Sequence, residues 1–308
     1  MPTPSARALS ATAFTTLLLI ACMMGANHVA ARFAFNHGVD VATAVVFRSG
    51  VTTLVMVALL VVQGIPLALT PRQRRALPLI GLIIGLQSLC LYSAVARLPV
   101  ALALLAFNTF PLWTALWARL LYRERPTPLL LKVMPVILFG LMLALDVFGA
   151  ASGLGAGAQW QRIGAGVAYA LAAASLFGIA LALTQHESQG VDGRVRTAFT
   201  MGVAGLVALL TVVLQGGFHL PVAVDGSGVA AGWIGLALLT LLYGTGITLL
   251  LTVLPRLGVV GNSAIMNVEP VAALVLAWLI LDQAIAPVQV VGALIVVGAV
   301  MTLGLRKR

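Results

Sequence analysis

The sequence predicts an all-α membrane protein, with ten transmembrane helices built as two inverted five-helix repeats. Three observations predict this fold class: the composition, the length of the apolar segments and a weak internal repeat. Of the 308 residues, 61% are hydrophobic and only 8% are charged, whereas a water-soluble domain carries about 25% charged residues. The composition therefore excludes a soluble globular enzyme and a disordered chain.

Ten apolar segments have the length of a transmembrane helix, which needs about 20 predominantly apolar residues. Turn residues separate them, as at Asn36-His37-Gly38, and none shows the alternation of a β-barrel strand. In the first half the predicted spans are Thr12–Phe35, Val41–Val62, Leu77–Ala96, Pro99–Leu121 and Leu129–Phe148. In the second half they are Arg162–Gln185, Thr197–Leu214, Val229–Val253, Val259–Leu281 and Pro287–Leu303.

The first span has a competing interpretation as a signal peptide, because Arg7 precedes an apolar run. The run continues past its weak cleavage-like site at Gly25-Ala26-Asn27 as far as Phe35, and nine more spans follow. We therefore interpret it as the first transmembrane helix.

The basic residues predict the orientation of the helices. The formal net charge is +10, from 18 Lys and Arg against 8 Asp and Glu. With the N-terminus in the cytoplasm, 14 of the 18 basic residues fall in cytoplasmic loops, and four lie on or near the outer half: Arg32, Arg48, Arg97 and Arg162. Cytoplasmic loops carry the excess of Lys and Arg in membrane proteins. Both termini are therefore predicted to be cytoplasmic, and the positive charge indicates topology, with no nucleic-acid partner.

The two halves of the sequence match when one is shifted by 159 residues. Arg97-Leu98-Pro99-Val100 then aligns with Arg256-Leu257-Gly258-Val259, and Asn108-Thr109-Phe110-Pro111 aligns with Asn267-Val268-Glu269-Pro270. The repeat contains five helices, and this odd number inserts the second copy in the opposite orientation. We expect two domains, residues 1–150 and 151–308. Inverted repeats are typical of secondary transporters, which bind substrate near the midplane of the membrane.

Two prolines mark corresponding places in the two halves. Pro111 and Pro270 each follow an Asn by three residues, and each lies 12 residues after the start of its motif, at Pro99 and Gly258. At about 1.5 Å per residue, both lie ~18 Å into a hydrocarbon core ~30 Å thick. Because proline removes a helix hydrogen bond, the pair predicts two functional kinks near a substrate site. A bend that serves only packing is the alternative.

These residues carry a resemblance to a known family. The segment from Asn108 to Leu116, followed by Arg123-Glu124-Arg125, resembles the fourth helix of EamA-type domains in the drug/metabolite transporter superfamily. The segment from Asn267 to Leu281 resembles the second copy. The resemblance covers nearly the whole chain as two tandem domains. It implies ten helices, inverted halves and export of small metabolites across a bacterial inner membrane.

One position departs from the family pattern. The family has a Glu thirteen residues after the proline, which is Glu124 in the first copy but Gln283 in the second, beside Asp282. We therefore expect its role in capping or charge to be retained in one half only.

Glu269 is the acidic residue that lies near the centre of a predicted span. Such a group costs about 2.5–3.5 kcal/mol to insert, so it should face the protein interior. It binds a coupling proton or a substrate amine, or else it is protonated and bonds the neighbouring broken helix. Arg48 either pairs with Asp40 at the outer end or lies in the cavity near a substrate carboxylate. His28 has no second intramembrane His nearby, which favours a packing role over a relay.

Aromatic and polar side chains indicate the walls of the predicted cavity. Thr109, Trp113 and Trp117 share one face of the fourth span, and Trp113 is too deep to be an interfacial anchor, the role expected of Tyr122. The predicted substrate-binding residues are Asn108, Trp113, Trp117, Gln87, Ser88, Tyr92, Tyr169, Tyr243, Asn267, Glu269, Trp278, Arg48 and His28. Such a lining suits a small amphipathic solute.

The sequence predicts a transporter and no enzyme, because it lacks paired intramembrane aspartates, HExxH and a phosphate-binding loop. Cys22 and Cys90 lie in spans as apolar fillers, so neither metal nor cofactor is expected. The expected substrates are amino acids, aromatic or bulky neutral. Drug or quaternary-amine efflux is the alternative, and a membrane-embedded enzyme or structural protein is a remote one. The expected partners are the lipid bilayer, a small-molecule substrate and a coupling proton, with no partner chain.

Overall fold

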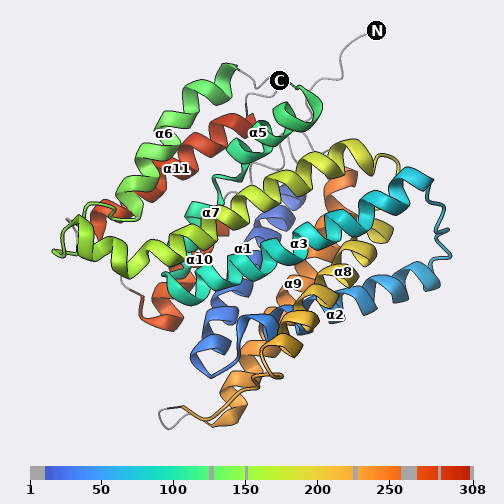
Figure 1. The fold of residues 1–308 in the computed structure, drawn as a ribbon, viewed down its shortest axis with the longest axis horizontal. Helices are drawn as coiled ribbons and strands as arrows, with labels where there is room; N and C mark the ends of the chain where they lie inside the picture. The colour runs from blue at the N-terminus through green and yellow to red at the C-terminus, as the bar shows by residue number, and fades with distance from the viewer. Residues whose placement is uncertain are drawn as a thin grey trace.

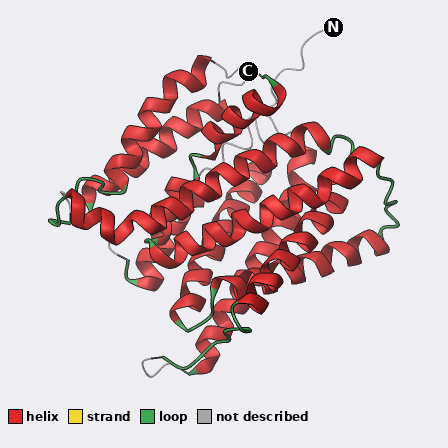
Figure 2. Ribbon diagram, viewed as in Figure 1, coloured by secondary structure: helices red, strands yellow, loops and turns green. Residues whose placement is uncertain are grey.

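The computed structural model describes residues 11–124, 128–149, 152–224, 228–257, 269–283 and 286–305. These residues form long helices joined by turns and short loops (Figure 2). The helices are α1 (Ala11–Asn36), α2 (Val41–Val62), α3 (Pro71–Arg97), α4 (Val100–Phe107), α5 (Phe110–Tyr122), α6 (Pro128–Ala144), α7 (Ala156–Glu187), α8 (Gly193–Leu214), α9 (Val229–Leu257), α10 (Glu269–Leu281) and α11 (Pro287–Leu305).

The described helices account for the apolar segments of the sequence. Seven are long and apolar enough to cross a membrane, when α4 and α5 are counted as one interrupted helix, Val100–Tyr122. Three shorter apolar helices, Lys132–Ala144, Glu269–Leu281 and Pro287–Ala299, lie within the remaining predicted spans. The start of the predicted span at Val259 lies outside the described residues.

Several helices extend beyond their predicted ends. The helix α3 begins six residues before Leu77, because Thr70 caps it in a reciprocal pair of bonds with Gln73. The helix α7 begins six residues before Arg162. Hydropathy detects only the part of a helix that lies in lipid, so polar ends escape it. By contrast α6 ends at Ala144, four residues before the predicted Phe148, in a turn where Asp146 has a φ of 48°.

The predicted fourth span is interrupted in the structure. Asn108 and Thr109 separate α4 from α5, and Pro111 occupies one of the first two positions of α5. A helix leaves its first N–H groups without intrahelical partners, so proline costs little at this place. The chain therefore breaks immediately before the proline.

The helices pack in pairs drawn from distant parts of the chain. The main pairs are α1 with α9 and α10, α7 with α3 and α5, α8 with α2 and α3, and α6 with α11. In Figure 1, α6 and α11 lie together on one side of the bundle, and α2 and α8 on the other. One buried core joins α3, α4, α6 and α7 to α10 and α11, and a second joins α1 and α2 to α9.

The outer surface of the bundle is apolar. Leu54, Val62, Leu206 and Leu214 are 65–83% exposed. A monomeric soluble protein rarely exposes apolar surface on this scale, whereas lipid is a suitable environment for it. The chain is a multi-pass membrane protein.

Candidate functional site

A buried polar cluster lies where α1, α2, α3, α9 and α10 meet. Its members come from these five helices and are linked by hydrogen bonds, ring contacts and one ion pair: Asn27, His28, Arg48, Ser88, Tyr92, Tyr243 and Glu269. We call this set the central cluster.

Tyr92 is the residue around which the central cluster is arranged. Its side chain is fully buried, and its hydroxyl donates to Asn27 Oδ1 over 3.0 Å. The His28 ring meets the Tyr92 ring edge to face, with centroids 5.8 Å apart. The Arg48 Cζ atom lies 4.8 Å from the centroid of the same ring. One tyrosine therefore contacts α1 and α2 from α3.

Arg48 lies between two tyrosine rings. Its Cζ atom is 4.0 Å from the centroid of Tyr243 on α9, and its Nη2 atom donates to Ser88 Oγ over 2.6 Å. The residue is 3% exposed. A cation over aromatic rings gains about 2 kcal/mol or more when it is desolvated, which offsets part of the cost of burying the guanidinium.

The pairing of Arg48 with Asp40, one of the two alternatives from the sequence, is wrong in this structure. The Asp40 carboxylate caps α2 by accepting from the Thr43 N–H over 2.9 Å, and it lies 3.7 Å from His219 Nδ1. A free helix N-terminus attracts such a carboxylate. Arg48, two turns further along α2, extends into the central cluster instead.

Glu269 joins the central cluster through His28. The His28 Nε2 atom lies 3.3 Å from Glu269 Oε1, and the side chains are 5% and 24% exposed. The helices α1 and α10 cross closely at Gly25, and this crossing brings His28 and Glu269 together. A Cβ atom on Gly25 would lie only 2.8 Å from the Glu269 carbonyl oxygen. Only glycine fits there.

Several polar atoms of this region are buried without a hydrogen-bond partner among the described residues. They are Asn27 Nδ2, His28 Nδ1, Arg32 Nε, Arg48 Nε and Ser49 Oγ. Buried polar atoms are nearly always paired in proteins, so this concentration indicates a place where a ligand or water supplies the partners.

A second group of predicted residues lies where α5 meets α7. The Trp117 Nε1 atom donates to Ser175 Oγ over 3.1 Å, and Trp113 packs on Gly178. Three rings close this junction, with centroids 5.1–5.7 Å apart: Phe107, Phe110 and Phe177. The junction of α5 and α7 is aromatic, whereas that of α1 and α10 is polar.

The sequence profile of the EamA-like transporter family matches residues 11–145 and, a second time, residues 164–305. The chain belongs to the EamA-like transporter family. No curated protein matches the sequence. One solved crystal structure of a protein overlaps 95% of this chain and 98% of its own, with a TM-score of 0.61 and 19% sequence identity. At this identity the likeness shows the fold alone.

In this EamA-like chain the remaining predicted residues take varied positions. Gln87 is buried and accepts from the Ser88 hydroxyl over 3.4 Å. Tyr169 is 38% exposed under Arg97, whose Cζ atom lies 4.8 Å from the ring centroid. Trp278 is 61% exposed on the outer surface. Asn108 follows α4 as its C-cap, Pro270 is buried at the start of α10, and Asn267 lies outside the described residues.

Asn27 and Ser49 of the EamA-like chain were not among the predicted site residues. The adjacent Asn27-His28 pair within an apolar span was the available signal. The sequence offered no way to see that His28 faces Glu269, because their helices lie at opposite ends of the chain. Among the described residues, no three His, Cys, Asp or Glu side chains are grouped as metal ligands.

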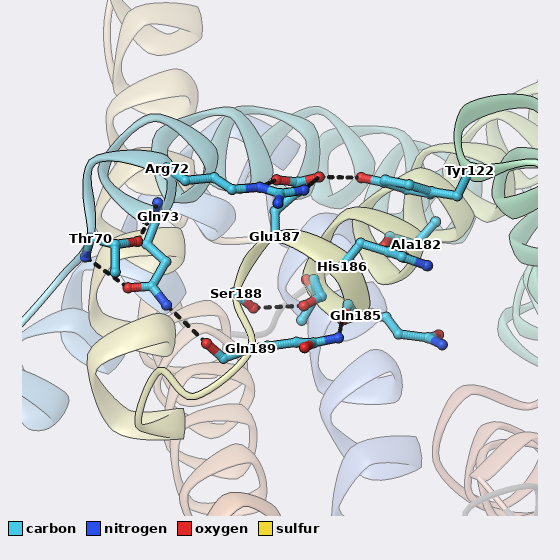
Figure 3. A network of polar contacts seen from close by, with 11 residues as sticks. Thr70, Arg72, Gln73, Tyr122, Ala182, Gln185, His186, Glu187, Ser188 and Gln189 are labelled. Atoms are coloured by element: carbon cyan, nitrogen blue, oxygen red, sulfur yellow. Dashed lines mark hydrogen bonds and ion pairs between the residues drawn. The ribbon is translucent and has the colours of Figure 1, made fainter.

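A polar network joins the ends of α3, α5 and α7, and Figure 3 shows it from close by. Arg72 makes a two-point ion pair with Glu187, with Nη2 2.8 Å from Oε1. The Tyr122 hydroxyl donates to the same carboxylate over 2.9 Å. The Gln73 side chain donates to the Gln189 carbonyl over 2.8 Å. We call this set, with His186 and Glu124, the end network. Tyr122, which was expected to be an interfacial anchor, therefore also makes polar contacts within the protein.

The end network also contains the Glu that differs between the two EamA-like copies. Glu124 Oε1 lies 2.9 Å from His186 Nε2, and the His186 ring stacks on Tyr122 with centroids 3.7 Å apart. The corresponding Gln283 accepts instead from the Val100 N–H over 3.0 Å. Each residue forms a polar contact between the end of its helix and a neighbouring helix, but only the residue in the first copy is a carboxylate.

Proposed function

We propose that this protein is a secondary-active transporter that exports small metabolites, foremost amino acids with aromatic or bulky neutral side chains. It would work in the inner membrane with both termini in the cytoplasm. The central cluster carries this proposal, because it places a buried guanidinium and a carboxylate in one site formed by helices from both family-matched segments. Intramembrane ionisable residues usually belong to substrate or ion pathways.

We infer that the fold consists of two inverted repeats, residues 1–150 and 151–308. The packing pairs support this arrangement, since α1 meets α9 and α10 as α7 meets α3 and α5. Gly25 approaches Ala273 on α10, and Gly178 approaches Thr114 on α5. The register of 159 residues between the halves relates Thr114 to Ala273. The two crossings thus fit a single motif used twice.

Alternating access would follow from rocking of one half against the other. The central cluster draws Asn27, Arg48 and Tyr92 from the first half and Tyr243 and Glu269 from the second. A site divided in this way changes its access when the halves rotate, while the bound solute stays near the midplane.

An amino acid suits the two signs of charge in the central cluster. Arg48 is a fixed cation, and Glu269 carries the acid on the far side of the His28 ring. A solute with an ammonium, a carboxylate and an apolar side chain complements such a site.

Efflux of drugs or quaternary amines is the second candidate function. It is favoured by the partly exposed Glu269 carboxylate, which could bind a cation, together with nearby aromatic rings. A buried arginine counts against it, because a cationic solute would be repelled by Arg48.

Flux measurements with the purified chain in proteoliposomes test the proposal. We expect saturable counterflow of labelled L-phenylalanine and little flux of labelled tetraphenylphosphonium, with and without a pH gradient. Protein-free liposomes are the control. Saturable flux of the phosphonium alone would favour the second candidate, and flux of neither would contradict export of aromatic amino acids. Chemical conversion of the solute would indicate an enzyme.

A further inference from the structure

Arg48 is a buried cation for which the described part of the chain supplies no anion. Among the described ion pairs, the acidic partners belong to His28, Arg72, His186, Arg194 and His219. A guanidinium that is 3% exposed loses its hydration. Tyrosine faces and one hydroxyl replace only part of that hydration, since neither carries a charge.

The atoms around Arg48 have an excess of hydrogen-bond donors. Arg48 Nε and Asn27 Nδ2 are donors that are buried without a described partner, and His28 Nδ1 is a third in the tautomer that carries its hydrogen there. All three side chains contact Tyr92. Ser49 Oγ, next to Arg48 in the chain, is also without a described partner. A group that only accepts hydrogen bonds complements such a set.

We propose that the central cluster binds the carboxylate of the substrate, with Arg48 as its anchor and Asn27 and His28 completing the contacts. This inference rests on the proposed function and names the group that the site recognises. The substrate class is then amphipathic carboxylates, so an amine is accepted but not required.

The chemistry of a carboxylate fits the cluster better than other anions or neutral groups. It is planar and accepts at two oxygens, which matches the fork of an arginine whose Nη2 is already held by Ser88. An amide presents one accepting oxygen and no charge, and its NH2 group would face a donor and leave it unsatisfied, which is a strong source of discrimination in a buried site. Glu269 would repel a carboxylate, so the anion belongs on the Arg48 side of Tyr92.

Four solutes with the same phenyl group separate the contributions of the two charges: L-phenylalanine, L-phenylalaninamide, 3-phenylpropionate and phenethylamine. Each of the other three is tested as an inhibitor of the counterflow of labelled L-phenylalanine in proteoliposomes. Thermal-shift titration of the purified full chain measures binding of all four without transport. We expect 3-phenylpropionate to compete, and the amide and the amine to bind at least tenfold more weakly.

Arg48→Gln should remove this preference by raising the KM for the carboxylates about 10- to 100-fold, while the weak binding of phenethylamine is unchanged. Arg48→Lys should retain part of the preference, because Lys keeps the charge without the planar fork, and it serves as the test if Arg48→Gln does not fold. Arg97→Gln is the matched control, since Arg97 is exposed and contacts Tyr169.

Two outcomes separate the inference from the proposed function. Equal binding of acid and amide, or an Arg48→Gln variant in which both solutes weaken alike, would overturn the inference even if phenylalanine is transported. Selective, Arg48-dependent binding of 3-phenylpropionate without phenylalanine flux would support the inference and contradict amino-acid export.

Discussion

The Nε2 atom of His28 lies 3.3 Å from Oε1 of Glu269, and this contact joins the middle of α1 to the first residue of α10. The pair is largely buried, and His28 Nδ1 has no described partner. A histidine and a carboxylate at this distance can share or exchange one proton. Glu269, the acidic residue near the centre of a predicted span, is thus paired with His28 from the other half of the chain.

Glu269→Gln should abolish the pH dependence of transport if this pair carries a coupling proton. Gln keeps the shape of the side chain and an oxygen that can face His28, but it cannot release a proton. In the unmodified protein we expect flux to vary by up to about tenfold per pH unit, the limit for one proton. Initial rates of phenylalanine counterflow at several pH values measure it. Glu124→Gln, at the exposed helix end, is the control, and an unchanged pH profile in Glu269→Gln would exclude the coupling role.

The sequence predicted the helices well, because a bilayer imposes a length and a composition that can be read from one chain. It also identified Glu269 as a candidate site residue, since an acidic side chain within an apolar span is costly to bury and usually has a function. It could not identify the partner of Glu269. That depends on the rotation of α1 against α10, which is set by the close approach at Gly25. Likewise the polar helix ends escaped hydropathy, so Glu187 and His186 were not recognised as members of one network with Tyr122.

Gly25→Ala should destabilise the protein by about 1–3 kcal/mol, because the new methyl group would press on backbone atoms of α10 that cannot move aside. Gly178→Ala should cost a similar amount at the matching crossing with α5, where Thr114 N would lie 2.7 Å away. Gly50→Ala is the control, since no atom lies within 4 Å of its added Cβ, and it should be neutral or stabilising by up to ~1 kcal/mol. Unfolding in detergent measures all three. Equal effects at Gly25 and Gly50 would contradict the packing.

Tyr92→Phe should weaken substrate affinity about tenfold while leaving the fold intact. The change removes the hydroxyl that donates to Asn27 Oδ1, and the freed amide can rotate away from the site. Leaving a buried acceptor unpaired costs about 1–3 kcal/mol. The KM for phenylalanine counterflow and the melting temperature are measured together, with Tyr122→Phe, which removes a donating hydroxyl outside the central cluster, as the control. A variant that loses stability but retains its KM would assign Tyr92 to packing alone.

Cross-linking across the end network should arrest transport if the halves rock. Gln73 lies on α3 in the first half and Gln189 follows α7 in the second, and the Gln73 side chain donates to the Gln189 carbonyl over 2.8 Å. A chain with Gln73→Cys and Gln189→Cys, and with Cys22 and Cys90 replaced by Ser, would be treated with a short bismaleimide. Because the reagent holds two helix ends that must separate when this face opens, counterflow should fall to the level of protein-free liposomes. Each single-cysteine chain, treated in the same way, controls for labelling itself. Full transport by chains shown by mass spectrometry to be cross-linked would mean that α3 and α7 move together, and the rocking of one half against the other would have to be abandoned.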